Sequence, residues 1–354
     1  EFQAALEIDP DREQTYYRRG VTYGDLGLFQ EGLKSLQKAL NLNPNHLDTL
    51  LQLGRFNSIL GNYQEAANHL NKLLKLAPNY SEVGLLSGKN LVELNQFKSA
   101  LPHLEKAVQQ QPNSFEAQFY LGLNLIRLNR SADAIAPFQK AVKIKPESAL
   151  TFNHLGQTYQ KLKMYPEAIF SYKQATRIEP NFTDAYNQLG TLYTFQKNYE
   201  MAIKMFQGAV QSNQKFQSGY FNLGMIYEIL GRHAEAIEQY NNILSLNPDH
   251  QKALLNLGWV MMDENRFMEA IPPLKHAIDL NLENTDAHYT LGLVFGRLKR
   301  YQDAQDQYQK VLQLDPNHTG AYERMALTEK AMKSTTVSAQ KNVFHEEQDI
   351  ILVP

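Results

Sequence analysis

Residues 183–216 read TDAYNQLGTLYTFQKNYEMAIKMFQGAVQSNQKF, and this stretch contains the pattern that decides the fold. Small and apolar residues recur in it at helical spacing, which predicts two α-helices that each carry one apolar stripe. The first stripe consists of Tyr186, Leu189, Gly190 and Tyr193, and the second, after a polar break at 196–198, of Ala202, Phe206 and Ala209. Two short antiparallel helices approach closely only where one side chain is very small, so the stretch predicts a tightly packed helix pair.

The same pattern repeats every 34 residues along the chain. Nine glycines share one phase: Gly20, Gly54, Gly88, Gly122, Gly156, Gly190, Gly224, Gly258 and Gly292. Alanine recurs at eight positions of a second phase, from Ala66 to Ala304, and Gly32 completes that series. Proline recurs after most of the predicted second helices, where it ends the helix and starts a linker. A fixed period of this length is the signature of a stacked repeat architecture.

One repeat carries the markers of a known family in order: Leu155-Gly156, Tyr159, Ala168, Tyr172, Ala175 and Pro180. With the 34-residue period, these markers resemble the tetratricopeptide repeat family along nearly the whole chain. The resemblance implies an all-α fold, a right-handed superhelical solenoid of antiparallel helix pairs. It also implies that the first helices line a concave groove that binds segments of partner proteins.

The period divides the chain into four parts. Residues 1–12 are expected to be the remnant of a preceding repeat, and 13–318 form nine tandem repeats. Residues 319–333 are expected to form a C-terminal capping helix, because Glu329 and Lys330 give it a polar outer face. Residues 334–354 are expected to be a flexible tail that ends in a short apolar motif.

Composition excludes several kinds of protein. The 354 residues are 43% hydrophobic and 20% charged, as is ordinary for a soluble folded chain. The net charge of −2 gives no field that would hold nucleic acid or a membrane surface. No apolar run of about 18 residues predicts a transmembrane helix. No signal peptide is visible, so we expect a soluble, cytoplasmic protein rather than a periplasmic or lumenal one, although the sequence does not identify the compartment.

The only tryptophan, Trp259, lies at an unusual place in its repeat. The family usually places tryptophan four residues before the glycine, in the core, where this chain has Leu254. Trp259 follows Gly258 directly and points about 150° away from the core stripe of its helix. We therefore expect it in the groove, together with Met262 and with Met225 one repeat earlier. The alternative is a tryptophan that packs against the neighbouring repeat.

Polar residues follow the same predicted face at intervals of 34 residues: His154, Gln188, Asn222, Asn256 and Thr290, with Asn153 and Asn187 in a shorter parallel row. Amide side chains both donate and accept hydrogen bonds, so such a ladder suits the backbone of an extended peptide. Members of the family that recruit peptides use asparagines in this way. The alternative is that these are solvated residues on an exposed helix face.

The N-terminal repeats are expected to carry a secondary, basic groove with Arg18, Arg55 and Lys89. It would favour an acidic partner segment, although mixed charge is also typical of a solvated helix. The family's chaperone-tail binders use a set of Lys, Arg and Asn that this chain matches only in part. Binding of chaperone tails is therefore not predicted.

No catalytic or metal-binding pattern is complete. Residues 84–89 are one residue short of a phosphate loop, and the histidines show no ligand spacing, so they are interpreted as solvated. No cofactor is predicted, and the chain is expected to be a non-enzymatic scaffold that binds an extended or helical partner segment. The alternative is the substrate-recruiting arm of a larger enzyme, such as a protein sugar transferase. Self-association through an open N-terminal repeat or the tail is a further expectation.

Overall fold

The computed structural model describes residues 12–78, 80 and 82–333. The chain divides into two compact units, Glu1–Ala185 and Tyr186–Pro354, which are described separately. Within the described residues every regular element is a helix, so the all-α class is confirmed. The predicted remnant, apart from Arg12, and the predicted tail lie outside the described residues.

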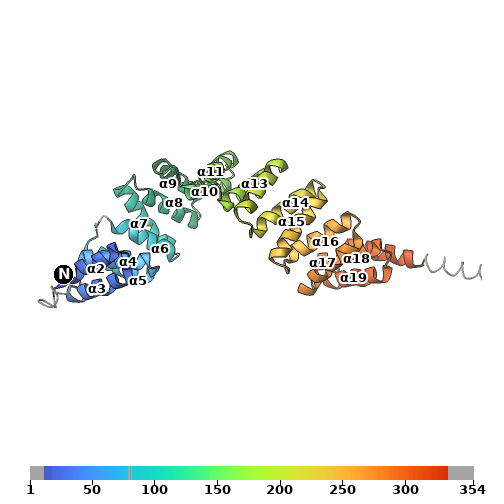
Figure 1. Ribbon diagram of the computed structural model, residues 1–354, viewed down its shortest axis with the longest axis horizontal. Helices are drawn as coiled ribbons and strands as arrows, with labels where there is room; N and C mark the ends of the chain where they lie inside the picture. The colour runs from blue at the N-terminus through green and yellow to red at the C-terminus, as the bar shows by residue number, and fades with distance from the viewer. Residues whose placement is uncertain (1–11, 79, 81, 334–354) are drawn as a thin grey trace, which may run out of the picture. The chain divides into compact units, whose positions relative to one another are not determined.

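The helices alternate between a first and a second helix of each pair (Figure 1). The first helices are α2 (Glu13–Asp25), α4 (Leu47–Ile59), α6 (Val83–Glu93), α8 (Phe115–Arg127), α10 (Ala149–Lys161), α12 (Thr183–Phe195), α14 (Gln217–Ile229), α16 (Gln251–Asp263) and α18 (Thr285–Arg297). The second helices are α3 (Phe29–Leu42), α5 (Tyr63–Leu76), α7 (Phe97–Gln110), α9 (Ser131–Ile144), α11 (Tyr165–Ile178), α13 (Tyr199–Ser212), α15 (His233–Leu246), α17 (Phe267–Leu280) and α19 (Tyr301–Leu314). Residues 319–333 are also helical.

Each unit is a stack in which sequence neighbours are neighbours in space. Within the first unit, successive helices from α2 to α11 pack on one another, and successive first helices also touch. Within the second unit, α13 to α19 follow the same order. Contacts of this kind define a solenoid, in which each repeat is stabilised by its immediate neighbours.

The repeat glycines let the two helices of a pair approach. A β-carbon built at Gly156 would lie 2.7 Å from the ring of Tyr172, and one at Gly190 would lie 2.5 Å from that of Phe206. The residue met in this way always lies 16 positions after the glycine and is buried: Leu36, Leu70, Leu104, Phe138, Tyr172, Phe206, Tyr240, Leu274 and Tyr308. The glycine of the first helix thus makes room for a large core side chain of the second helix.

Each first helix is followed, two positions after its last residue, by a residue with positive φ, seven positions after the repeat glycine: Gly27, Gly61, Asn95, Asn129, Lys163, Lys197, Gly231, Asn265 and Lys299. The left-handed conformation turns the chain so that the following amide reaches back to the last turn, as when Asn62 N donates to Asn57 O at 2.8 Å. Lysine adopts this conformation at a cost that glycine avoids.

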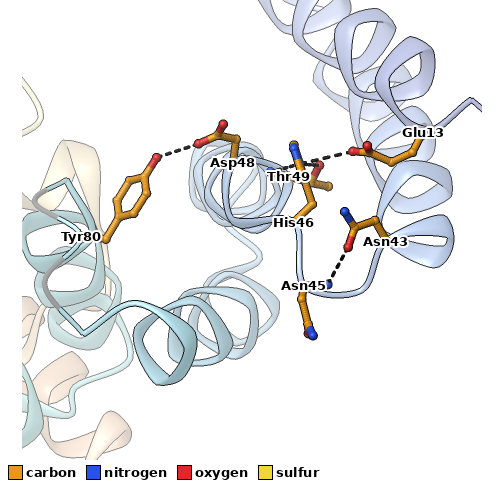
Figure 2. A network of polar contacts seen from close by, with 7 residues as sticks. All are labelled: Glu13, Asn43, Asn45, His46, Asp48, Thr49 and Tyr80. Carbon is orange, nitrogen blue, oxygen red and sulfur yellow. Dashed lines mark hydrogen bonds and ion pairs between the residues drawn. The ribbon is translucent and has the colours of Figure 1, made fainter.

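Polar side chains fix the linker between α3 and α4 (Figure 2). Asn43 Oδ1 accepts a hydrogen bond from Asn45 N at 3.3 Å, which closes a turn after the second helix. His46 Nδ1 accepts from Thr49 N at 3.2 Å and so caps α4.

The start of α4 is also tied to the linker between α5 and α6. Tyr80 Oη donates to Asp48 Oδ1 at 2.7 Å (Figure 2), and this bond to a carboxylate raises the pKa of Tyr80 to about 12. The phenol therefore remains a hydrogen-bond donor at neutral pH.

The linker caps correct the interpretation of the histidines as solvated. His250 and His318 cap their helices as His46 does, each accepting at Nδ1 from a backbone amide at 3.1 Å. His288 is buried, and its ring nitrogens lie within hydrogen-bond distance of Gln307 and of the Leu282 carbonyl. The sequence pattern missed these roles because helix caps lie outside the apolar stripes.

Candidate functional site

Three hollows lie on one recurring surface, which we call the first-helix face. It consists of the residues two positions before and one, four and five positions after each repeat glycine. These residues supply most of the lining of all three hollows, one in the first unit and two in the second. A surface that recurs with the repeat is a property of the architecture.

The Trp259 pocket has a volume of about 480 Å³ and lies in the second unit, between α16, α18 and the helix at 319–333. Its apolar lining includes Trp259, Met262, Leu293 and Leu327. The Trp259 side chain is 45% exposed, whereas Leu254 on the core side of α16 is buried. The helical geometry predicted this exposure, and the structure adds that Trp259 and Met262 share one pocket.

The Met225 pocket lies on the two preceding first helices, α12 and α14, and has a volume of about 290 Å³. Met225 and Asn222 line it from α14, and both were predicted on this face. Phe195 and Ile229 line it as well, and both side chains are largely exposed. The sequence analysis missed these two residues, although both lie five positions after a repeat glycine.

The polar ladder is only partly open to a ligand in the second unit. Asn222 Nδ2 donates to Asn187 Oδ1 at 3.0 Å, and Asn256 Nδ2 donates to the Tyr240 hydroxyl at 3.1 Å. Gln188 is half-buried. Thr290 is buried, and its hydroxyl donates to the Asp286 carbonyl at 2.8 Å within α18, so it does not present a donor to a ligand.

In the first unit, Asn153 and His154 do not form the predicted exposed row. Asn153 is 3% exposed, and its Oδ1 has no hydrogen-bond partner among the described residues. The His154 ring stacks on Phe138 with centroids 5.9 Å apart, and burial lowers its pKa. Asn153 is buried because it lies three residues before the repeat glycine, a position at which most other repeats carry Tyr, Leu or Phe.

Of the three residues predicted for the basic groove, only Arg55 and Lys89 line a common hollow. We call it the Arg55–Lys89 pocket, and its volume is about 380 Å³. Arg55 forms an ion pair with Glu82, and Lys89 Nζ lies 4.9 Å from the centroid of the Tyr120 ring. Glu93 also lines the pocket, so its charge is mixed. Arg18 is exposed and is not among the lining residues.

Other surfaces carry hollows too. One of about 710 Å³ is lined by Arg19, Lys34 and Lys38 and lies mainly against second helices. Another, of about 500 Å³, includes the exposed Phe170 of α11. The two hollows occupy equivalent positions three repeats apart, so a hollow against second helices recurs as well. Five pairs of lining residues show this: Gln37 and Gln139, Leu53 and Leu155, Asn57 and Tyr159, Glu65 and Glu167, His69 and Ser171.

Within residues 12–78, 80 and 82–333, no group of histidine, aspartate and glutamate side chains is arranged to hold a metal ion. No helix of the same residues is long and apolar enough to cross a membrane.

Comparison with solved structures identifies several similar folds. The C-terminal part of a repeat-containing protein from Cytophaga hutchinsonii matches with a TM-score of 0.61 and 16% identity, over 68% of this chain and 99% of that one. YrrB, described as a TPR protein with an unusual peptide-binding site, matches with a TM-score of 0.49 and 20% identity, over 52% of this chain and 96% of its own. MamA from Desulfovibrio magneticus RS-1 matches with a TM-score of 0.45 and 28% identity, over 48% and 96% of the two chains.

A comparison with curated proteins found no similar sequence. Sequence models of one family, described as Tetratricopeptide repeat, match residues 11–79, 85–149, 149–182, 171–204, 218–250 and 285–318. These segments cover most of the chain and both units. The chain therefore belongs to the tetratricopeptide repeat family.

Proposed function

We propose that this chain binds an extended or helical segment of a partner protein on its first-helix face, with the Met225 and Trp259 pockets as the main anchoring sites. Membership of the tetratricopeptide repeat family supports a protein-interaction scaffold.

The observation that carries the proposal is the exposure of Trp259 at the wall of a pocket. Tryptophan is enriched among the residues that dominate binding energy, and burying such a ring gives a large apolar gain. A tryptophan that is 45% exposed beside a hollow of about 480 Å³ still has nearly half of its surface available for burial by a ligand.

The neighbouring pocket adds further apolar surface. Phe195, Met225 and Ile229 are all exposed there, on two successive first helices. Contiguous exposed apolar side chains mark interaction surfaces in soluble proteins. Methionine and the half-buried amides Asn222 and Asn256 supply adaptable packing and polar contacts beside them.

The test combines capture with an optical signal. Proteins retained from native lysate by the wild-type chain are identified, and a tryptophan-free fragment of a retained protein is then titrated. Because Trp259 is the only tryptophan, any change in tryptophan emission reports on this pocket. Binding on the first-helix face is expected to shift the emission to shorter wavelength, and Trp259→Ala is expected to weaken binding.

The control is Phe170→Ala, which removes another exposed aromatic ring, 60% exposed, from a second helix. It is expected to leave the affinity unchanged. Equal affinity of wild type and Trp259→Ala, with no change in emission, would refute the assignment of the surface.

A further inference from the structure

Three repeats place a tyrosine 16 positions after the repeat glycine, and two of these tyrosines have an internal hydrogen-bond acceptor. Tyr172 Oη donates to Gln160 Oε1 at 2.7 Å, and Tyr240 Oη donates to Glu228 Oε1 at 2.5 Å. Both acceptors lie four positions after their repeat glycine. A buried phenol needs such an acceptor, because an unmade hydrogen bond in the interior is costly.

The third tyrosine, Tyr308, has lost this acceptor. The equivalent position in its repeat is Gly296, which has no side chain. Tyr308 is 1% exposed, and its hydroxyl makes no hydrogen bond to any described residue. Both Gly296 and Tyr308 line the Trp259 pocket. The space that a glutamine or glutamate side chain fills in the other two repeats is therefore open here.

A side chain would fit into that space without strain. A β-carbon built at Gly296 would lie 3.7 Å from Tyr308 Oη, an ordinary van der Waals distance, and no other described atom beyond its chain neighbours and the adjacent helix backbone lies within 4 Å. Burial raises the pKa of Tyr308 to about 12, so its hydroxyl is protonated and points a donor at the pocket at neutral pH.

The charges around the pocket favour an acidic ligand over a neutral one. Arg297 and Arg324 both line it, and neither forms an ion pair with a described residue. Asp263 is the only carboxylate in the lining, and one of its oxygens lies 3.4 Å from His233 Nε2. Guanidinium groups form charge-assisted hydrogen bonds with carboxylates, whereas their hydrogen bonds with a neutral amide ligand would be weaker.

We infer that the Trp259 pocket receives a glutamate or aspartate side chain of the partner segment, in the place of the side chain that Gly296 lacks. The carboxylate accepts the hydroxyl hydrogen bond of Tyr308 and faces Arg297 and Arg324. An apolar residue next to it in the partner segment contacts Trp259. This inference rests on the proposed function, because it specifies the chemistry of one anchoring site on the same face.

The test begins with a library of random peptides displayed with their C-terminal ends joined to the carrier, so that no free α-carboxylate is available. Peptides selected on the wild-type chain are expected to carry an acidic residue next to an aromatic or aliphatic one. A selected peptide is then synthesised with both ends blocked, together with its Glu→Gln or Asp→Asn counterpart. The amide counterpart is expected to bind about tenfold more weakly or worse, the loss typical of a hydrogen bond to a charged group.

The decisive variant is Gly296→Gln, which recreates the pair seen between Gln160 and Tyr172. Its side chain is expected to fill the space and accept from Tyr308, so peptide binding should weaken by about tenfold or more. Glycine is a poor helix residue, so the variant is expected to be at least as stable as wild type in urea unfolding. Loss of binding would then not arise from unfolding.

Arg324→Gln tests the charge, with Lys310→Gln as the matched control because Lys310 is exposed and does not line the pocket. Arg324→Gln is expected to weaken binding of the acidic peptide, and Lys310→Gln is expected to leave it unchanged. Both affinities are measured by titration calorimetry.

The outcomes separate the two proposals. If selected peptides lose affinity with Trp259→Ala but bind Gly296→Gln as tightly as wild type, the first-helix face remains a binding surface and the acidic-side-chain inference is overturned. Selected peptides without acidic residues overturn it as well. If no peptide is enriched on the wild-type chain, or if Trp259→Ala has no effect, the proposed function is overturned together with the inference.

Discussion

Gly292 and Gly296 lie one turn apart on α18 and both face Tyr308, so they form a matched pair of sites. A β-carbon at Gly292 would lie 2.5, 2.8 and 3.1 Å from three atoms of the Tyr308 ring, whereas one at Gly296 would lie 3.7 Å from its hydroxyl. We therefore predict opposite effects for the same substitution: Gly292→Ala destabilises the chain and Gly296→Ala stabilises it.

The magnitudes follow from two contributions. Replacing glycine by alanine in a helix stabilises it by up to about 1 kcal/mol at either position, with less at Gly296 because it lies in the last turn. At Gly292 the added methyl group must displace a ring that is 1% exposed and fixed by its neighbours, and such overpacking costs about 1–3 kcal/mol. The free energies of unfolding of the two variants are therefore expected to differ by about 0.5–2.5 kcal/mol, with Gly296→Ala the more stable.

The assay is urea unfolding followed by far-ultraviolet circular dichroism, with wild type and both variants measured side by side. Unfolding of repeat arrays need not be two-state, so the full curves are compared as well as their midpoints. A Gly292→Ala curve that coincides with that of Gly296→Ala would show that Tyr308 moves aside freely. That result would refute the argument that the repeat glycines are required by close helix approach.

Three further variants test other parts of the structure. Burial lowers the pKa of His154 below its ordinary value of 6.5, so the contribution of this residue to stability is fully present above that pH and is lost as pH falls toward the folded-state pKa. The unfolding free energy of His154→Gln should therefore depend less on pH between pH 7.5 and 5 than that of wild type. An unchanged slope would contradict this. Asn153→Leu removes a buried oxygen without a partner and is expected to raise the unfolding free energy by about 1 kcal/mol, whereas a decrease would mean that the amide is satisfied. Lys299→Gly removes the strain of a left-handed residue (φ of 60°) and is expected to raise the free energy of unfolding by about 1 kcal/mol. The control Lys310→Gly, within α19, should lower it by a similar amount. Changes of the same sign for both variants in thermal unfolding would refute the role of the turn.

The fold class could be predicted from residues whose role in packing depends only on the geometry of one helix pair. Gly190 and Ala202 mark the contact between two helices wherever they occur in the period, so one repeat predicts the others. The same logic placed Trp259 on the outer side of α16, because the angle between residues of one helix is fixed. The left-handed residues Lys163, Lys197 and Lys299 escaped notice because lysine is not a residue that normally marks such a turn.

The polar ladder shows where residue type misleads. Asn153 and Thr290 were predicted to face a ligand because they are polar, yet both are buried. Their surroundings depend on contacts with neighbouring helices, which the stripe of a single helix does not describe. Equivalent positions in different repeats are more informative. Gly296 stands where two other repeats carry Gln160 and Glu228, and this difference is visible in the sequence. Its consequence, an open space beside the Tyr308 hydroxyl, is visible only in the structure.

The Met225 pocket is lined mainly from α12 and α14, and the Trp259 pocket from α16, α18 and the helix at 319–333, so the two follow one another along the first-helix face of the second unit. A linear partner that carries two matching motifs could occupy both, and its second motif would then bind as a tethered ligand at millimolar effective concentration. Avidity of this kind raises the apparent affinity by about 10²–10⁴ without any new contact. Two individually weak motifs, rather than one strong one, would then be enough to hold such a partner, and weakening either motif would release it steeply.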